Sequence, residues 1–232
     1  MALRRNDPAQ YDQLVDQWWQ PAGGFAMLHW FAAARAEDIP PAPHPGAVLV
    51  DLACGGGLMA PHVARLGYRH VGVDLSRPGL VVARDHGLAP LRGSVLAVPL
   101  ADGCADVVVA GEVLEHVEDD VAVLAECARL LRPGGTLVVD AIAATPLARL
   151  LAVRIGERIP GGPPRGIHDP ALFVDRRRLL AAAGPLGLDL RLVGLRPALR
   201  DVLPWLLRRR PTVRMRPMRS TAVVFAAYGR RR

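Results

Sequence analysis

Short apolar runs and helical stretches alternate through the middle of the chain. The run 48–52 precedes a helical stretch over 58–66, the run 71–73 precedes a helical stretch over 77–86, and another short run lies near residue 91. Short strands separated by helices are typical of βαβ units, in which the strands form a parallel sheet with right-handed crossovers. The pattern therefore predicts an α/β domain.

The same alternation continues toward the C-terminus. An apolar run over 107–110 is followed by a predicted helix over 119–131 and, after the turn Arg132-Pro133-Gly134-Gly135, by a strand over 136–140. Further strands are predicted over 188–195 and 221–228. Together these elements predict a Rossmann-like sheet of seven mostly parallel strands with helices on both faces.

The two flanks of this pattern are organised differently. Residues 1–45 combine a helical, aromatic segment with a proline-rich linker, and they are expected to form an N-terminal cap. Residues 46–232 are expected to form the main domain, and the helical and turn-rich stretch over about 143–170 is expected to be an insertion or lid. A further helix is predicted over about 175–183.

Composition limits the compartment and the chemistry. No apolar stretch is long enough to span a membrane, and the three cysteines have neither a zinc-binding spacing nor an even number, so a cytoplasmic protein with reduced thiols is expected. The net charge is +7, yet the sequence contains no lysine. Pyridoxal Schiff bases and P-loop phosphate sites both require a lysine amine and are therefore excluded.

A strand that runs into a glycine-rich turn is the most informative stretch. Residues 48–57 read VLVDLACGGG and open a helical stretch. Glycine lets the backbone approach a ligand, and the amides at a helix N-terminus offer donors and the positive end of the helix dipole. Asp74 ends the next strand, where its carboxylate can accept both ribose hydroxyls of a nucleoside. The combination predicts a nucleoside-containing cofactor.

Two cofactors fit this arrangement. The spacing Gly55-x-Gly57-x-x-Ala60, with Asp74 further on, also satisfies the dinucleotide fingerprint. Asp51 favours the other option, because a carboxylate there can orient the turn or meet the ammonium group that S-adenosylmethionine carries and NAD does not. An NAD(P)-dependent oxidoreductase remains the alternative, although a chain without lysine has no Tyr-Lys proton relay.

Several motifs together resemble those of the class I S-adenosylmethionine-dependent methyltransferases. They are residues 51–57, Asp74, Glu112-Val113-Leu114-Glu115-His116-Val117 and Leu131-Arg132-Pro133-Gly134-Gly135. Four more segments are similar to the O-methyltransferases of ubiquinone biosynthesis, which act on polyprenylated phenols and catechols such as 3-demethylubiquinol: Trp18-Trp19, Phe25, Leu28-His29 and Gly166-Ile167-His168-Asp169. The resemblance covers most of the chain and implies O-methylation of a phenolic hydroxyl.

The resemblance also implies which residues bind the cofactor. The family's contacts, the turn and the neighbouring strand ends fall on Arg35, Asp51, Ala53, Cys54, Gly55, Gly57, Asp74, Leu75, Ser94, Val95 and Gly111. Ala53 replaces the family's first glycine, which a negative φ would allow. Gly111 stands where a larger apolar residue would cover the adenine, and Ser94 stands where many class I enzymes carry an acid for the adenine amine. These departures predict modest cofactor affinity.

Four side chains are candidates for chemistry beyond cofactor binding. His168 follows a loop rich in glycine and proline, and it either removes a phenolic proton or only caps the loop. Glu112, Glu115 and His116 share one face of a helical turn, as metal ligands, as an acid–base cluster with a catalytic His116, or as packing. Mg²⁺ suits this set only in part, because it prefers oxygen ligands.

Surface features leave further alternatives open. The stretch 146–159 forms either a lid helix or a membrane-docking face, with Leu147, Leu150, Leu151 and Ile155 at helical spacing and Arg154 and Arg158 in the same arc. Trp18 and Trp19 roof the cofactor, grip an apolar acceptor or only pack. The densest basic patch suits anionic lipid or RNA, or is a solvated face; it consists of Arg208, Arg209, Arg210, Arg214, Arg216 and Arg219 beside Trp205.

These features set the expected partners. We expect a small, lipid-like acceptor, with peripheral contact to an anionic membrane as an option, and we do not expect nucleic acid as a partner. An RNA-modifying methyltransferase that uses the basic patch ranks third.

Overall fold

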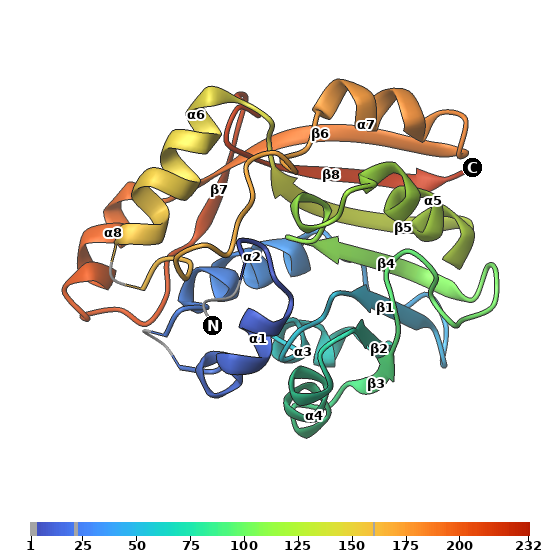
Figure 1. The fold of residues 1–232 in the computed structure, drawn as a ribbon. Helices are drawn as coiled ribbons and strands as arrows, with labels where there is room; N and C mark the ends of the chain where they lie inside the picture. The colour runs from blue at the N-terminus through green and yellow to red at the C-terminus, as the bar shows by residue number, and fades with distance from the viewer. Residues whose placement is uncertain (1–3, 21–22, 160) are drawn as a thin grey trace.

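The central strands of a mixed sheet are rich in valine and leucine, because helices cover both faces of the sheet and the side chains on both faces are buried. The computed structural model describes residues 4–20, 23–159 and 161–232. Its sheet has eight strands in the order β3-β2-β1-β4-β5-β8-β6-β7 (Figure 1). The strands are β1 (Val48–Leu52), β2 (Arg69–Asp74), β3 (Ala89–Arg92), β4 (Ala105–Gly111), β5 (Leu131–Ile142), β6 (Leu188–Pro197), β7 (Met215–Met218) and β8 (Val224–Arg231).

The first five strands are parallel, and the last three add antiparallel pairs. β8 runs antiparallel to both β5 and β6, and β7 runs antiparallel to β6. In the parallel part, Asp51 of β1 lies beside Gly72 of β2 and Val109 of β4. The carboxyl ends of these strands therefore meet at one edge of the sheet.

Helices cover both faces of the sheet (Figure 1). One face is covered by α5 (Asp120–Leu130) and α7 (Arg176–Ala183), and the other by α2 (Ala26–Glu37), α3 (Ala60–Val63) and α4 (Arg77–Asp85). The remaining helical segments are α1 (Ala9–Gln13), η1 (Val15–Gln17), η2 (Ala64–Leu66), η3 (Leu114–His116), α6 (Pro146–Ala148), the π-helical η4 (Arg149–Ile155), η5 (Gly156–Arg158) and α8 (Leu199–Leu206). The predicted Rossmann-like α/β fold is confirmed.

The predicted count of seven strands is wrong, because the basic stretch contains an additional strand. β7 pairs with β6 through Met215 and Met218, and Met215 is buried while Arg216 is exposed. The same stretch is preceded by α8, which the sequence pattern did not predict. Among the described residues, no helix is both long and apolar enough to cross a membrane.

Candidate active site

The carboxyl ends of β1, β2, β4 and β5 bring the predicted cofactor residues to one edge of the sheet. The glycine turn follows β1, Asp74 ends β2, Gly111 ends β4, and Asp140 lies near the end of β5. Ligands of open α/β sheets bind at this edge. The topology thus assembles the site from segments that are far apart in the sequence.

The glycine turn is more strained than expected. Gly55 and Gly57 have φ values of +51° and +78°, and Ala53 also lies in the left-handed region, with φ of +54°. The condition of a negative φ at Ala53 is therefore not met, because the backbone keeps the conformation of a glycine turn although the residue has a Cβ. Gly57 is needed for packing, since a Cβ there would lie 2.9 Å from the Ala83 Cα.

Asp74 is held by the backbone around it. Its Oδ2 accepts a hydrogen bond from the Gly55 amide at 2.8 Å, and its Oδ1 accepts one from the Ser76 amide at 2.7 Å. Burial raises the pKa of Asp74, while these hydrogen bonds lower it. Each carboxylate oxygen retains a second lone pair, so the side chain can still accept from a diol.

Arg35 lies across the end of β4 and explains Gly111. Its Nε donates to the Asp140 Oδ2 at 2.5 Å, and both side chains are buried. A Cβ on Gly111 would clash with the Arg35 guanidinium, so the guanidinium occupies the place where a larger side chain would stand. Asp140 Oδ1 accepts from the Glu112 amide at 2.9 Å, which ties the ends of β4 and β5 together. Sequence reasoning missed Asp140, although an acid at the end of a predicted strand was a signal.

The other predicted cofactor residues differ in burial and in their contacts. Asp51 and Cys54 are buried beneath the turn, and Asp51 Oδ2 lies 3.4 Å from the Nε2 of His70, a buried partner that sequence reasoning missed. Ser94 Oγ accepts from the Leu96 amide at 3.2 Å, close to the end of β3. Val95 belongs to the hydrophobic core, and Leu75, directly after Asp74, is 54% exposed. Those of the predicted residues that lie at the carboxyl ends of the strands form the candidate cofactor site.

The N-terminal segment covers the glycine turn. The buried Trp18 ring lies against Gly55 and Gly56 so closely that a Cβ on either glycine would clash with it. Trp18 stacks on Phe25 with ring centroids 4.1 Å apart, and Trp19 Nε1 donates to the Gly56 carbonyl at 2.9 Å. The two tryptophans thus pack against the rest of the N-terminal segment and also cover the glycine turn.

Glu112, Glu115 and His116 differ in how far their polar atoms are paired, since Glu112 Oε1 and Glu115 Oε2 are buried without a hydrogen-bond partner among the described residues. Glu115 Oε1 accepts from the Ile142 amide, and burial raises the pKa of Glu115 to about 8. His116 Nδ1 lies 2.5 Å from the Asn6 Oδ1, and its Nε2 lies 3.3 Å from the Tyr11 hydroxyl. Burial lowers the pKa of His116 to about 3. No group of three metal-ligating side chains occurs in the described part of the chain.

His168 is a buried imidazole at the lid and lies beside His116, with ring centroids 5.5 Å apart. The buried carboxylate of Glu157, from η5, holds its segment. Glu157 Oε1 lies 3.5 Å from the His168 Nδ1, and Glu157 Oε2 accepts from the Gly166 amide at 2.9 Å. Arg5 donates to Glu157 at 3.1 Å and also to the His168 carbonyl. Burial raises the pKa of Glu157, but the contacts with His168, Gly166 and Arg5 outweigh it and lower the pKa, so Glu157 remains ionised.

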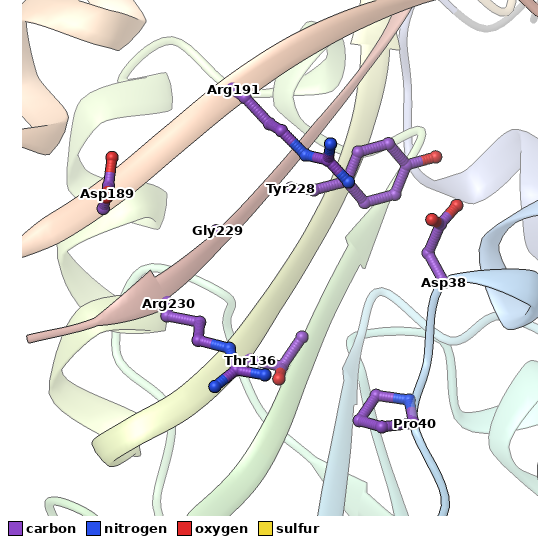
Figure 2. A pocket seen from close by; sticks show the side chains of 8 residues that line it. All are labelled: Asp38, Pro40, Thr136, Asp189, Arg191, Tyr228, Gly229 and Arg230. Carbon is purple, nitrogen blue, oxygen red and sulfur yellow. The ribbon is translucent and has the colours of Figure 1, made fainter.

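One cavity, of about 390 Å³, lies away from this site. It is lined by side chains of β5, β6 and β8 and by Asp38 and Pro40 after α2 (Figure 2). The Arg191 guanidinium lies 5.8 Å from the centre of the Tyr228 ring, and Thr136 marks the beginning of the regular part of β5. The cavity therefore opens toward the edge of the sheet opposite to the glycine turn.

Comparison with known sequences identifies close relatives of this chain. Residues 50–139 match the methyltransferase domain family. The ubiquinone biosynthesis O-methyltransferase of Ralstonia nicotianae is 37% identical over 194 residues, which cover 79% of this chain and 82% of that protein. The enzyme of the same name from Thiobacillus denitrificans is 35% identical over 192 residues, covering 78% and 82%.

Solved structures agree with the fold. An S-adenosylmethionine-dependent methyltransferase from Thermotoga maritima superposes with a TM-score of 0.65 at 17% identity, over 96% of this chain and 97% of that one. Another, from Aquifex aeolicus, gives a TM-score of 0.58 at 14% identity, over 96% and 97%. At such identities the likeness concerns the fold alone.

Proposed function

Since this chain belongs to the family of the ubiquinone biosynthesis O-methyltransferases and uses S-adenosylmethionine as its methyl donor, we propose that it methylates a phenolic hydroxyl of a prenylated, quinone-like acceptor. The enzyme class is S-adenosylmethionine-dependent methyltransferase, EC 2.1.1. The NAD(P)-dependent alternative is therefore set aside. The single observation that carries the acceptor chemistry is the buried His168, held by an ionised Glu157 at the lid.

The residues at the strand ends fit the donor. Asp74 would hold the ribose, the amides of the turn from Ala53 to Gly57 would face its polar groups, and Arg35 would offer a cation at the far side of the turn. When bound, the donor supplies a methyl group on a sulfonium, which is already a good leaving group. No nucleophilic side chain is required, and the protein has to align the reactants and exclude water.

His168 is the proposed general base. Its Nδ1 faces Glu157, which favours the tautomer with the proton on Nδ1 and leaves Nε2 to accept the phenolic proton. As this proton moves to Nε2, the phenolic oxygen forms a bond to the methyl carbon and the carbon–sulfur bond breaks. Glu157 is a positioning residue, because it acts through His168. His116 is not assigned this role, since both its ring nitrogens already face partners.

Magnesium is kept as an alternative at Glu112, Glu115 and His116: Glu112 Oε1 and Glu115 Oε2 are buried without a hydrogen-bond partner among the described residues, whereas both ring nitrogens of His116 face partners. The acceptor is proposed to enter beneath the lid of residues 143–170, whose exposed Leu147, Leu150, Leu151 and Ile155 offer an apolar surface. Peripheral contact with an anionic membrane would deliver such an acceptor. A cytoplasmic location is proposed with it, in keeping with the free thiols of Cys54, Cys104 and Cys127.

The test is methyl transfer to a water-soluble catechol, followed by mass spectrometry of the product. We expect an O-methylated catechol, and we expect His168→Gln to lower kcat by about 10² to 10⁴ while calorimetric affinity for S-adenosylmethionine stays unchanged. His44→Gln, at a half-exposed site away from the lid, is the matched control. Full activity of His168→Gln would contradict the assignment of the base, and methylation at another atom would contradict the assignment of the acceptor.

A further inference from the structure

A buried acid, Asp140, lies where β4 and β5 end together. It is the register partner of Gly111, and it is completely buried. Its Oδ1 accepts a hydrogen bond from the Glu112 amide at 2.9 Å, and its Oδ2 accepts one from the Arg35 Nε at 2.5 Å. Because a buried charge is costly unless it is paired and hydrogen-bonded, these two contacts are what keeps a carboxylate at this position.

The pairing with Asp140 leaves the tip of Arg35 available. The two terminal nitrogens of its guanidinium form no hydrogen bond with a residue that the structure describes. The guanidinium lies against Gly111, where a Cβ would clash with it. Burial lowers the pKa of Arg35, but Asp140 and Glu112 outweigh this and raise the pKa, so the side chain remains a cation. A fixed guanidinium with free terminal donors is suited to a carboxylate.

The place of this guanidinium matches the anionic end of the methyl donor. In the sheet, β1 lies between β2 and β4, and a spacing of about 4.8 Å between strands puts the ends of β2 and β4 about 10 Å apart. With the ribose on Asp74 at the end of β2, the amino-acid end of the donor extends over the glycine turn toward β4. The carboxylate is the one anionic group of S-adenosylmethionine, and Arg35 is the cation that it meets there.

We propose that Asp140 is a positioning residue for donor binding: it holds the Arg35 guanidinium against Gly111, so that the terminal nitrogens bind the carboxylate of S-adenosylmethionine. The inference rests on the donor site described under the proposed function, and it adds the group that Arg35 binds and the acid that holds Arg35. An arginine side chain loses much rotamer freedom when it is fixed. Fixing it before the donor arrives lowers the entropy lost on binding.

The experiment is calorimetric titration of the full chain with S-adenosylhomocysteine, which has the amino-acid end, and with methylthioadenosine, which lacks it. Asp140→Asn keeps the size of the side chain and an oxygen for the Glu112 amide, but it removes the negative partner of Arg35. We expect affinity for S-adenosylhomocysteine to fall about tenfold and affinity for methylthioadenosine to stay unchanged. The matched control is Asp201→Asn, a similarly buried acid paired with Arg214, which should change neither affinity.

A double-mutant cycle tests whether Asp140 acts through Arg35. Arg35→Gln should itself weaken binding of S-adenosylhomocysteine, and Asp140→Asn in that background should weaken it no further, because the side chain that Asp140 holds is gone. Gly111→Ala alters neither charge, but its Cβ displaces the guanidinium. It should also weaken binding of S-adenosylhomocysteine alone, and it keeps the proposal testable if Asp140→Asn does not fold.

Three results would overturn the proposal. Equal losses for both ligands in Asp140→Asn or Gly111→Ala would show that these residues only maintain the strand ends. Unchanged or tighter binding of S-adenosylhomocysteine to Asp140→Asn would show that Asp140 does not prepare Arg35 or competes with the ligand for it. No loss in Arg35→Gln, or a further loss in the double variant, would show that Asp140 acts without Arg35. These titrations need no acceptor, so their failure can be told apart from a failure of the proposed phenol methylation.

Discussion

The two halves of this methyltransferase use their apolar side chains differently. Between residues 46 and 142, most large apolar side chains are buried between the parallel strands and their helices, and Leu75, Val81 and Leu96 are the exposed exceptions. From residue 143 onward, exposed leucines and isoleucines recur along the lid helix and α8. The half up to residue 142 buries most of its apolar side chains in its own core, whereas the half from residue 143 leaves several of them exposed.

Buried acids are also treated differently in the two halves. Ala53 and Glu112 both adopt positive φ at the ends of the neighbouring strands β1 and β4, where the donor would bind. Glu115 is fully buried beside them and forms no ion pair with any residue that the structure describes, whereas Asp201 of α8 is paired with two arginines. The strand ends of the first half thus combine two strained residues with a buried carboxyl that keeps its proton.

The largest expected effect is on the donor site. Asp74→Ala should weaken binding of S-adenosylmethionine at least about hundredfold, because it removes hydrogen bonds to a charged group and frees the Gly55 amide. Calorimetric titration with S-adenosylmethionine, S-adenosylhomocysteine and NAD measures this. Asp85→Ala, on the exposed side of α4, is the control. Unchanged affinity would mean that the ribose is held elsewhere.

Leucine substitutions test the contrast between the halves directly. Leu124→Ala should cost about 2 to 5 kcal/mol of unfolding free energy, because Leu124 is fully buried. Leu203→Ala should change it by less than about 0.5 kcal/mol, because that side chain already faces water. Urea denaturation measures both. If the two variants lost similar stability, α8 would belong to the core and the division would not hold.

The buried Glu115 should make stability depend on pH. Its pKa in the folded chain, about 8, exceeds that of an ordinary glutamate because of burial. The folded state therefore keeps a proton that the unfolded state releases, and stability should fall as the pH rises from about 5 to about 8, by up to about 1.4 kcal/mol per pH unit. Glu115→Gln should reduce this slope in urea titrations, and the exposed Glu118→Gln should not. An equal slope in both variants would place the proton on another group.

The smallest expected effect concerns the strained turn. Ala53→Gly should raise unfolding free energy by up to about 1 kcal/mol, because relief of left-handed strain exceeds the entropy that glycine adds to the unfolded chain. Ala36→Gly, within α2, should lower it by about as much. Thermal denaturation compares the two. A loss of stability in both variants would show that the turn does not strain Ala53.

The parallel half was predictable from sequence because each of its elements carries a local signal. The run 48–52 coincides with β1, and the run 107–110 lies within β4. The glycine turn and Asp74 lie where the pattern placed them. The site partners were not predictable: Asp140 reaches Arg35 across 105 residues, and no local pattern records such a pair. α8 and β7 were missed because prolines and dense arginines obscure their periodicity, and β7 exists only where β6 offers an edge.

The tryptophans give this enzyme a built-in optical reporter. All four lie outside the sheet: Trp18 and Trp19 rest on the glycine turn, and Trp30 and Trp205 meet beneath α8. Intrinsic fluorescence therefore records solvent access above the glycine turn and at the inner face of α8, and it reports little on the strands. A red shift of emission while the sheet stays folded would mark the release of the tryptophans from the glycine turn or the separation of α8 from α2.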